Sequence, residues 1–579
     1  MKEDLPFQNR RWAQAIIQEL VSQSACYFCI APGSRSALLS ISAAEAANAN
    51  PPEVETFVHF DERGLAYHAL GYAKSSQKPA VIIVTSGTAV ANLLPAIMEA
   101  HHAMVPLIIL SADRPPELRD NCSNQATDQV KLFQSFVRWQ IDLPCPNEQL
   151  PQNYLGTTIA QAVYRATRSP KGPVHLNCMF REPFTTSKIG SSPISFHPSY
   201  EHPESVPSSE TIAKWAGLLE GFEERGVILL GPFVTKRTLE PVFALAEKLG
   251  WPIFADILSP ARIEGRKRQM LPYFDLLLKV DPNKKVDVVM QFGDRLVSKA
   301  VLEWVARSQI KAHFLVADHP FRIDPLHTVT HRLEADPVLV CEEFCKKITR
   351  DFPRDETWWE VSQMIEEELE RFFSSSETLS EPYCIEFLKR HLNANFSLFL
   401  SNSMPVRDAD QFFFPAHQTG SIYCNRGLSG IDGNIATAAG IGQGMKKPTF
   451  AVLGDLATLH DINSLAQLKK SHPPVICLVF NNGGGAIFSF FPHYAGTPHF
   501  ETMIAAAHPF TLQDAASLFQ LPYFSPKTPE HFEEIILDCL DRPQSCLIEV
   551  TTTRNDNFSI HQTILNELKK CSLTPSMAL

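Results

Sequence analysis

The sequence has no long apolar run, no excess of positive charge and no repeated cysteine motif. No segment reaches the roughly 18 apolar residues of a membrane-spanning helix, and the opening MKEDLPFQNRRW lacks the apolar core of a signal peptide. The formal net charge of -11 argues against a general nucleic-acid or anionic-membrane surface, because both need a basic field. We therefore expect a cytoplasmic protein with neither kind of partner.

The cysteines do not form a disulfide or metal-binding pattern. Their count of 13 is odd, which in a long chain favours reduced thiols over a disulfide framework. Cys26 and Cys29 make one CxxC, but they lie in a predicted strand, where residues i and i+3 face opposite sides. Without a second CxxC or a histidine pair, we interpret both as core residues.

The length of 579 residues exceeds what one hydrophobic core supports, and about 150 residues per domain suggests roughly three or four domains. With 44% hydrophobic, 10% aromatic and 20% charged residues, the composition is typical of a globular protein. Segments 1–190 and 381–579 repeat one pattern of apolar strand, small-residue turn and helix. We predict an α/β protein in which these two parallel-sheet domains flank a middle domain at 210–350.

The middle segment has a Rossmann-like pattern, with predicted strands in RGVILLGPFV, WPIFADILS and VDVVMQFGDRL. Its first turn carries only Gly231 and lacks the GxGxxG that lets a backbone approach a pyrophosphate, so we expect no dinucleotide there. The Ser- and Pro-rich stretch 190–209 is interpreted as a linker. GIGQG at 440–444 follows small residues and no strand, which favours tight helix packing over a phosphate loop.

Asp455 follows the apolar stretch AVLG, at the expected carboxyl end of a strand, where open α/β sheets bind ligands. Asn482 ends the next apolar stretch, so the two side chains could converge. A carboxylate, an amide oxygen and a backbone carbonyl would supply half of a Mg²⁺ shell, and a diphosphate the rest. The glycines at 483–485 permit close approach, and a helix starting near Thr458 would direct N–H groups at phosphate. For either piece alone, a helix cap or an Asn-Gly turn is the simpler interpretation.

Together, GDL and NNGGG resemble the cofactor motif of thiamine-diphosphate enzymes. A longer string that includes APGSRS, HFDERGLAYHALG, SADRPPELRD, SNSMPVRD and NRGLSGIDG is similar to one family, the menaquinone-pathway 2-succinyl-5-enolpyruvyl-6-hydroxy-3-cyclohexene-1-carboxylate synthases. The resemblance implies two thiamine-diphosphate-binding-fold domains, and an enzyme that decarboxylates 2-oxoglutarate and adds the succinyl carbanion to isochorismate. It also implies thiamine diphosphate with Mg²⁺, or with Mn²⁺ in its place, and a homodimer or homotetramer whose catalytic sites are shared between chains.

The resemblance also implies roles for single residues. Glu62, at a strand-to-helix junction, would face the aminopyrimidine ring and activate the cofactor, although Glu62 or Asp61 could instead cap the helix. The metal would be bound by Asp455, Asn482 and Gly484. The remaining implied contacts are Gly454, Leu456 and Ile431 to the cofactor, with Ile487 and Phe488 in an apolar wall.

Two dianionic substrates require several cationic side chains at strand ends. The candidates are Arg35, Arg114, Lys299, Arg407 and Arg426, with Ser34, Gln125 and Ser403 as neutral hydrogen-bonding companions. One such cation alone is more often part of a surface ion pair, so the prediction of a substrate site depends on the whole set of cations. Two residues depart from the family pattern. Ala300 stands where some relatives have a second basic residue, and Ala457 stands where a hydroxyl residue is frequent.

Three alternatives compete with this prediction. The first is another thiamine-diphosphate decarboxylase or carboligase, against which the set of cations argues. The second is a catalytically silent binding protein of the same fold, which the presence of both Glu62 and Asp455 disfavours. The third, a nicotinamide oxidoreductase, lacks the glycine fingerprint. Fold alone would not separate these functions.

Overall fold

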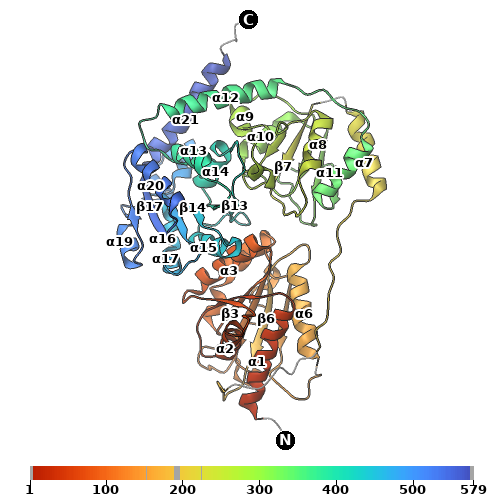
Figure 1. The fold of residues 1–579 in the computed structure, drawn as a ribbon, viewed down its shortest axis with the longest axis vertical. Coiled ribbons are helices and arrows are strands. Elements are labelled where there is room, and N and C mark those ends of the chain that lie inside the picture. Colours follow the sequence, from red (N-terminus) through yellow and green to blue (C-terminus); the bar gives the residue numbers. More distant parts are fainter. Residues whose placement is uncertain (1–3, 152, 188–195, 223–224, 574–579) are drawn as a thin grey trace.

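Three parallel β-sheets, each covered by helices, organise the chain in the computed structural model (Figure 1). The structure describes residues 4–573 apart from 152, 188–195 and 223–224, so part of the predicted linker lies outside the described residues. The predicted α/β class, with two similar parallel-sheet domains around a Rossmann-like one, is confirmed. No helix among the described residues is long and apolar enough to span a membrane.

The first sheet has the strand order β2-β1-β3-β4-β6-β5. Its strands are β1 (Tyr27–Ile30), β2 (Glu55–Val58), β3 (Ala80–Val84), β4 (Leu107–Asp113), β5 (Trp139–Leu143) and β6 (Val174–Met179). One face is covered by α1 (Leu5–Ser22), α2 (Ala37–Ala47) and α6 (Tyr154–Thr167), and the other by α3 (Glu62–Ser76) and α5 (Leu94–His102). Strands β1, β3, β4 and β6 are buried at every position because helices lie on both faces, which explains their continuous apolar runs.

The middle sheet has the order β11-β10-β9-β7-β8. Its strands are β7 (Gly226–Leu230), β8 (Ile253–Ala255), β9 (Val288–Phe292), β10 (Ala312–Ala317) and β11 (His331–Glu334). Its helices are α7 (Ser209–Gly221), α8 (Glu240–Leu249), α9 (Phe274–Val280), α10 (Lys299–Ser308) and α11 (Pro337–Lys347). Buried apolar residues of this layer and of the third sheet form one continuous cluster, to which α12 (Thr357–Ser374) also contributes.

The third sheet, ordered β13-β12-β14-β15-β17-β16, repeats the order of the first when its strands are counted from β12. Its strands are β12 (Ser397–Leu400), β13 (Ile422–Cys424), β14 (Thr449–Gly454), β15 (Val475–Asn481), β16 (Tyr523–Phe524) and β17 (Cys546–Thr551). One face is covered by α13 (Glu381–His391), α14 (Met404–Phe412), α20 (Pro529–Asp541) and α21 (Arg554–Leu573), and the other by α15 (Asn434–Met445) and α17 (Leu465–Leu468). The first and third domains therefore share one fold.

Helices α3 and α15 join the first and third domains at close range (Figure 1). A Cβ atom on Gly71 would lie 2.1 Å from the carbonyl oxygen of Thr437, and one on Gly440 would lie 2.0 Å from that of His68. Only glycine permits this approach, because no real Cβ comes so near a backbone oxygen. The interpretation of GIGQG as a helix-packing motif is confirmed.

Candidate active site

Asp455 lies where strand β14 passes directly into helix α16 (Asp455–His460), beside the end of β15. The predicted start near Thr458 is wrong: the helix begins at Asp455, whose carboxylate accepts the backbone N–H of Leu456 at 2.6 Å in the first turn. The same carboxylate accepts the backbone N–H groups of Asn482 at 3.1 Å and Gly484 at 2.8 Å. Burial raises the pKa of Asp455 from its ordinary value, and the hydrogen bonds from the Gly484 and Leu456 backbone act in the opposite direction.

In the side-chain amide of Asn482, the nitrogen has a hydrogen-bond partner and the oxygen has none among the described residues. Its Nδ2 donates to Glu381 at 3.0 Å, whereas its Oδ1 is buried without a hydrogen-bond partner among the described residues. The loop beyond it requires glycine, because Gly483 and Gly484 have φ values of +73° and +143°. A buried carboxylate and an unpartnered amide oxygen form a hard oxygen donor set, which fits Mg²⁺. Within the described chain, no three His, Cys, Asp or Glu side chains gather into a metal-binding cluster.

Glu62 is the first residue of α3, but the cap is Asp61. The Asp61 carboxylate accepts the backbone N–H groups of Arg63 at 3.0 Å and Gly64 at 3.4 Å, so the capping role does not occupy Glu62. Glu62 is half-buried, and its carboxylate makes no hydrogen bond or ion pair within the described residues. Arg63 donates at 2.8 Å to the carbonyl oxygen of His460, the last residue of α16, so this turn faces the helix end opposite Asp455.

Two of the predicted cations meet at strand ends of the first domain. Arg114 is buried and donates to the Ser86 hydroxyl at 2.5 Å and to the carbonyl oxygen of Gln125 at 2.7 Å. Arg35 donates to the carboxylate of Glu182 at 2.7 Å. Burial and the nearby Arg35 charge lower the pKa of Arg114, which shows that the two guanidinium groups share one region. Ser34 and Gln125 are exposed beside them.

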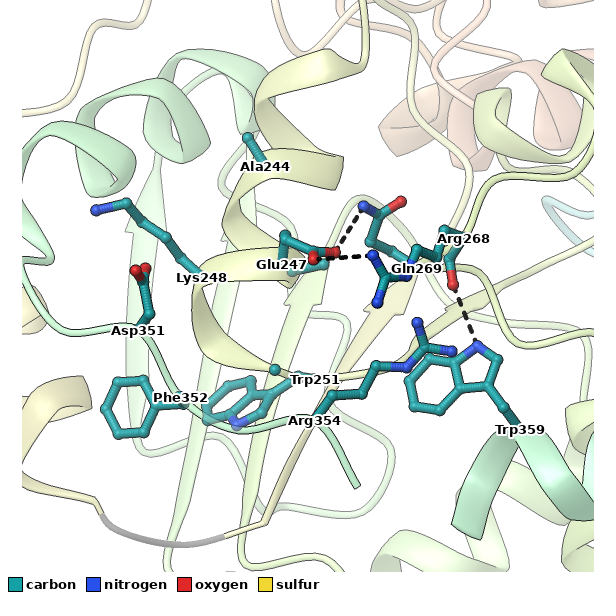
Figure 2. A pocket seen from close by; sticks show the side chains of 12 residues that line it. Ala244, Glu247, Lys248, Trp251, Arg268, Gln269, Asp351, Phe352, Arg354 and Trp359 are labelled. Atoms are coloured by element: carbon teal, nitrogen blue, oxygen red, sulfur yellow. Dashed lines mark hydrogen bonds and ion pairs between the residues drawn. The ribbon is translucent and has the colours of Figure 1, made fainter. Parts of the chain in front are cut away.

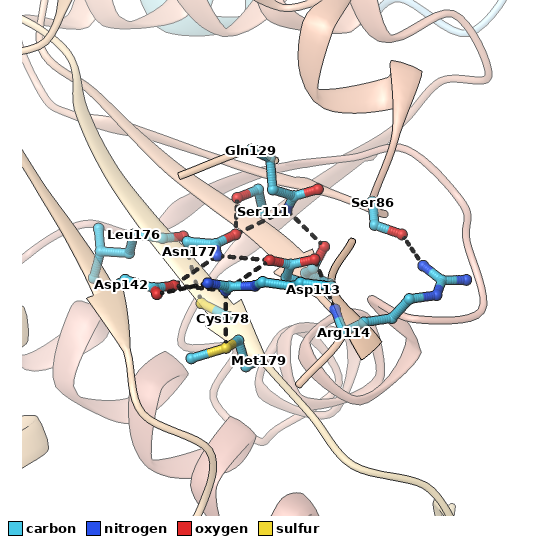
Figure 3. A network of polar contacts seen from close by, with 12 residues as sticks. Ser86, Ser111, Asp113, Arg114, Gln129, Asp142, Leu176, Asn177, Cys178 and Met179 are labelled. Carbon is cyan, nitrogen blue, oxygen red and sulfur yellow. Dashed lines mark hydrogen bonds and ion pairs between the residues drawn. The ribbon is translucent and has the colours of Figure 1, made fainter. Parts of the chain in front are cut away.

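A buried polar network supports Arg114, and sequence reasoning missed it (Figure 3). Asn177 donates to Asp113 at 2.9 Å and to Asp142 at 2.7 Å, and Arg119 bridges the same two carboxylates. Gln129 donates to Asn177 at 2.8 Å, which ties the loop after β4 to the sheet. The sequence indicated this network only in part, because polar residues at the ends of apolar strands are typical both of ligand-binding sites and of helix caps.

The other predicted cations lie in the third and middle domains. Arg407 and Arg426 follow β12 and β13, and burial together with the Arg426 charge lowers the pKa of Arg407. Arg407 donates to the carbonyl oxygen of Ser403 at 2.5 Å, and Arg426 donates to the Asn402 side chain at 3.1 Å. Lys299, on α10, is different, because its side chain is 73% exposed and pairs with Glu303 on its own helix.

The apolar residues predicted to contact the cofactor or the substrates lie on different loops. Ile487 and Phe488 are half-buried on the turn η5 (Ala486–Phe490), directly after the glycine loop. The Lys299 ammonium lies 5.9 Å from the ring centre of Phe491, so the middle domain reaches this turn. Ile431 is exposed on the loop before α15. Gly454 and Leu456 flank Asp455 and are half-buried.

A cavity of about 480 Å³ opens on the middle domain instead (Figure 2). Arg268 lies 3.7 Å from Glu247 there, and the guanidinium group of Arg354 stacks 3.4 Å from the ring centre of Trp359. None of the residues predicted for the site lines this cavity, and its three cations, Lys248, Arg268 and Arg354, already have partners. We assign it no ligand.

Comparison with protein families gives the class of this protein. Residues 10–132 match the model described as "Thiamine pyrophosphate enzyme, N-terminal TPP binding domain", residues 196–400 match "Middle domain of thiamine pyrophosphate", and residues 405–550 match "Thiamine pyrophosphate enzyme, C-terminal TPP binding domain". A putative thiamin diphosphate-dependent enzyme from Mycobacterium smegmatis has the same fold, with a TM-score of 0.69 at 17% identity over 93% of this chain and 99% of that one. The fold is that of a thiamine-diphosphate enzyme.

Curated relatives narrow the class to one family. The 2-succinyl-5-enolpyruvyl-6-hydroxy-3-cyclohexene-1-carboxylate synthase of Rubrobacter xylanophilus is 39% identical over 98% of this chain and 99% of its own length. That of Salinibacter ruber is 36% identical, with 96% of each chain covered. The chain belongs to this synthase family of thiamine-diphosphate-dependent enzymes.

Proposed function

We propose that the enzyme removes carbon dioxide from 2-oxoglutarate and joins the remaining succinyl unit to isochorismate, and that it does so with Mg²⁺ at Asp455. The observation that carries the metal proposal is the buried, unpartnered Asn482 oxygen beside the Asp455 carboxylate. Asp455, Asn482 and the Gly484 carbonyl would hold Mg²⁺, and the same oxygen ligands would accept Mn²⁺ in its place. Thiamine diphosphate, when bound, supplies the electron sink that decarboxylation needs.

The chain's own residues would then divide the work. Glu62, free of a capping role, would exchange a proton with the cofactor's aminopyrimidine ring. The Arg35 and Arg114 pair and the Arg407 and Arg426 pair each concentrate positive charge in a largely buried place, which suits dicarboxylate substrates. Ile487 and Phe488, beside the glycine loop, would keep water from the reacting atoms.

The working unit that we propose is a homodimer, or a tetramer of two such dimers, with shared sites. In one chain, the turn that carries Glu62 contacts the His460 end of α16, whereas the metal ligand Asp455 is at the other end. Beside Glu62, Val58 is 54% exposed and Phe60 65%, at the open edge of the first sheet. A second chain would cover these apolar side chains and bring its own Asp455 loop to Glu62.

The experiment that tests the activity is incubation with thiamine diphosphate, Mg²⁺, 2-oxoglutarate and isochorismate, followed by mass analysis. We expect the 2-succinyl-5-enolpyruvyl adduct, and only decarboxylation products when isochorismate is omitted. The Glu62→Gln enzyme is the matched control and should form neither. Equal product from pyruvate in place of 2-oxoglutarate would favour a general carboligase and contradict the proposal.

A further inference from the structure

The metal-ligand loop rests on one face of the C-terminal helix α21. Side chains at 554, 557, 558 and 561 lie on this face, since residues three, four and seven apart align on a helix. Arg554 donates a hydrogen bond to the carbonyl oxygen of Gly483. Phe558 and His561 contact the ring of Phe490, with ring centres 5.3 Å and 5.2 Å away. Helix α21 therefore contacts both the loop and the turn that follows it.

Glu381, the first residue of α13, connects this helix to the side chain of Asn482. It is 1% exposed, and its Oε1 accepts from Asn482 Nδ2 and from the Thr552 hydroxyl, each at 3.0 Å. Its Oε2 accepts from Asn557 Nδ2 at 2.9 Å. Because Glu381 binds the NH₂ group of the Asn482 amide, the amide oxygen must point away from Glu381. This oxygen is the Oδ1 atom that has no hydrogen-bond partner among the described residues.

We infer that Glu381 is a positioning residue that sets the amide orientation of the metal ligand Asn482, and that Asn557 on α21 holds Glu381 in place. The inference rests on the proposed function, because Asn482 is a ligand only if the site binds a divalent cation. Partners behind metal ligands fix the ligand orientation, and their loss costs roughly 10- to 100-fold in metal affinity.

The arrangement does not depend on the charge of Glu381. Its Oε1 accepts from Asn482 in either protonation state, since a proton on Oε2 would face the Asn557 amide. The Oδ1 atom of that amide has no hydrogen-bond partner among the described residues, so the amide can turn to accept. Glutamine at position 381 can reproduce this arrangement, whereas alanine cannot.

The test is Mn²⁺ binding at saturating thiamine diphosphate, measured from the signal of free Mn²⁺ in electron paramagnetic resonance. We expect the dissociation constant to rise roughly 10- to 100-fold in Glu381→Ala and to stay within about threefold in Glu381→Gln. Glu386→Ala is the matched control, because Glu386 is also buried on α13 but pairs with Lys389, away from the loop. Its Mn²⁺ affinity should equal that of the wild type.

The outcomes separate the positioning role from the proposed function. If the wild type binds no Mn²⁺ with the cofactor present, both the proposed function and this inference are overturned. If the wild type binds Mn²⁺ and Glu381→Ala binds it equally well, only the positioning role is overturned. The positioning role is also overturned if Glu381→Gln or Glu386→Ala loses as much Mn²⁺ affinity as Glu381→Ala. Should Glu381→Ala fail to fold, Asn557→Ala replaces it, with an expected rise of about three- to tenfold and an unchanged constant as the contradicting result.

Discussion

At the scale of single residues, the hydrogen bonds of Asp455, Asn482 and Glu62 separate the atoms that the chain itself pairs from the atoms left for a ligand. Three backbone N–H groups donate to the buried Asp455 carboxylate, whereas the Asn482 side-chain oxygen has no hydrogen-bond partner in the part of the chain that the structure describes. In most proteins buried amide oxygens are paired internally, so the unpaired Asn482 oxygen beside the Asp455 carboxylate favours a ligand at these converging strand ends. The same reasoning applies to Glu62, whose neighbour Asp61 takes over the cap.

Replacement of Asp455 by alanine should abolish Mg²⁺-dependent cofactor binding. The change removes the one anionic metal ligand proposed and also the acceptor that holds the Asn482 and Gly484 backbone, so we expect thiamine diphosphate affinity to fall roughly 100-fold or more. Titration calorimetry with and without Mg²⁺ measures this. Asp514→Ala, at an exposed aspartate of the same domain, is the control, and an unchanged affinity in Asp455→Ala would contradict the metal site.

Replacement of Arg407 by alanine should impair substrate use and spare the cofactor. Charge-assisted hydrogen bonds in a largely dry site contribute roughly 1.5 to 3 kcal/mol, so KM for one substrate should rise about 10- to 150-fold. Lys299→Ala should have a smaller effect, because the Lys299 side chain is 73% exposed and exposed ion pairs are weak. Steady-state kinetics with Arg371→Ala as an exposed control checks this, and a loss of cofactor affinity instead would count against the assignment.

Some of these residues could be read from the sequence and others could not. Asp455, Arg114 and Arg426 follow apolar stretches, and this position predicts ligand binding at the edge of a parallel sheet before any coordinates are known. Glu381 and Arg554 carry no such mark, since they reach the loop across 101 and 71 residues of chain, and only the packing of α13 and α21 brings them there. For the same reason, the exposure of Lys299 could not be predicted.

At the scale of elements, strands were the easiest to predict, because helices on both faces require continuous apolar runs. The start of α16 was placed three residues late, near Thr458 instead of Asp455, since a strand that passes into a helix at once leaves no loop signal. The glycines of α15 were recognised as packing residues from their small neighbours alone.

The crossing of α3 and α15 gives a prediction for these glycines. Alanine at Gly71 or Gly440 would place a Cβ near 2 Å from a backbone oxygen of the other helix, so the helices must separate and we expect a loss of about 2 kcal/mol or more. Gly217→Ala is the matched control, because among the described residues no atom from outside its own stretch of helix lies within 4 Å of the Cβ position of that glycine. It should raise stability by roughly 0.5 to 1 kcal/mol. Urea unfolding measures all three, and a neutral Gly440→Ala would contradict the close crossing.

At the scale of the whole molecule, a buried histidine links domain docking to pH. His68 on α3 hydrogen-bonds Gln467 on α17 at 3.0 Å, and burial lowers its pKa from 6.5 to about 3. Between pH 6.5 and pH 3, the His68 ring is therefore protonated in the unfolded chain but neutral in the folded chain. The contribution of His68 to the free energy of unfolding is fully present above about pH 6.5 and is lost as the pH falls towards 3.

The expected slope for this histidine is about 1.4 kcal/mol per pH unit within that window. His68→Gln should therefore lose less stability between pH 6.5 and pH 4 than the wild type, whatever its stability at pH 8. Urea unfolding at each pH gives the two slopes, and the exposed His499→Gln should follow the wild type. Parallel slopes in His68→Gln and the wild type would show that the buried ring does not titrate in this way.

The last prediction concerns the sharing of sites between two chains. If Glu62 of one chain works with Asp455 of another, a dimer of Glu62→Gln and Asp455→Ala chains has one site with both residues intact and one with neither. Random exchange of equal amounts makes about half of the dimers hybrid, so mixing two inactive enzymes should restore about a quarter of the wild-type activity. Affinity tags of two kinds, one on each variant, measure the hybrid fraction directly. Activity should rise in proportion to that fraction, because sites built within one chain would remain inactive in every hybrid.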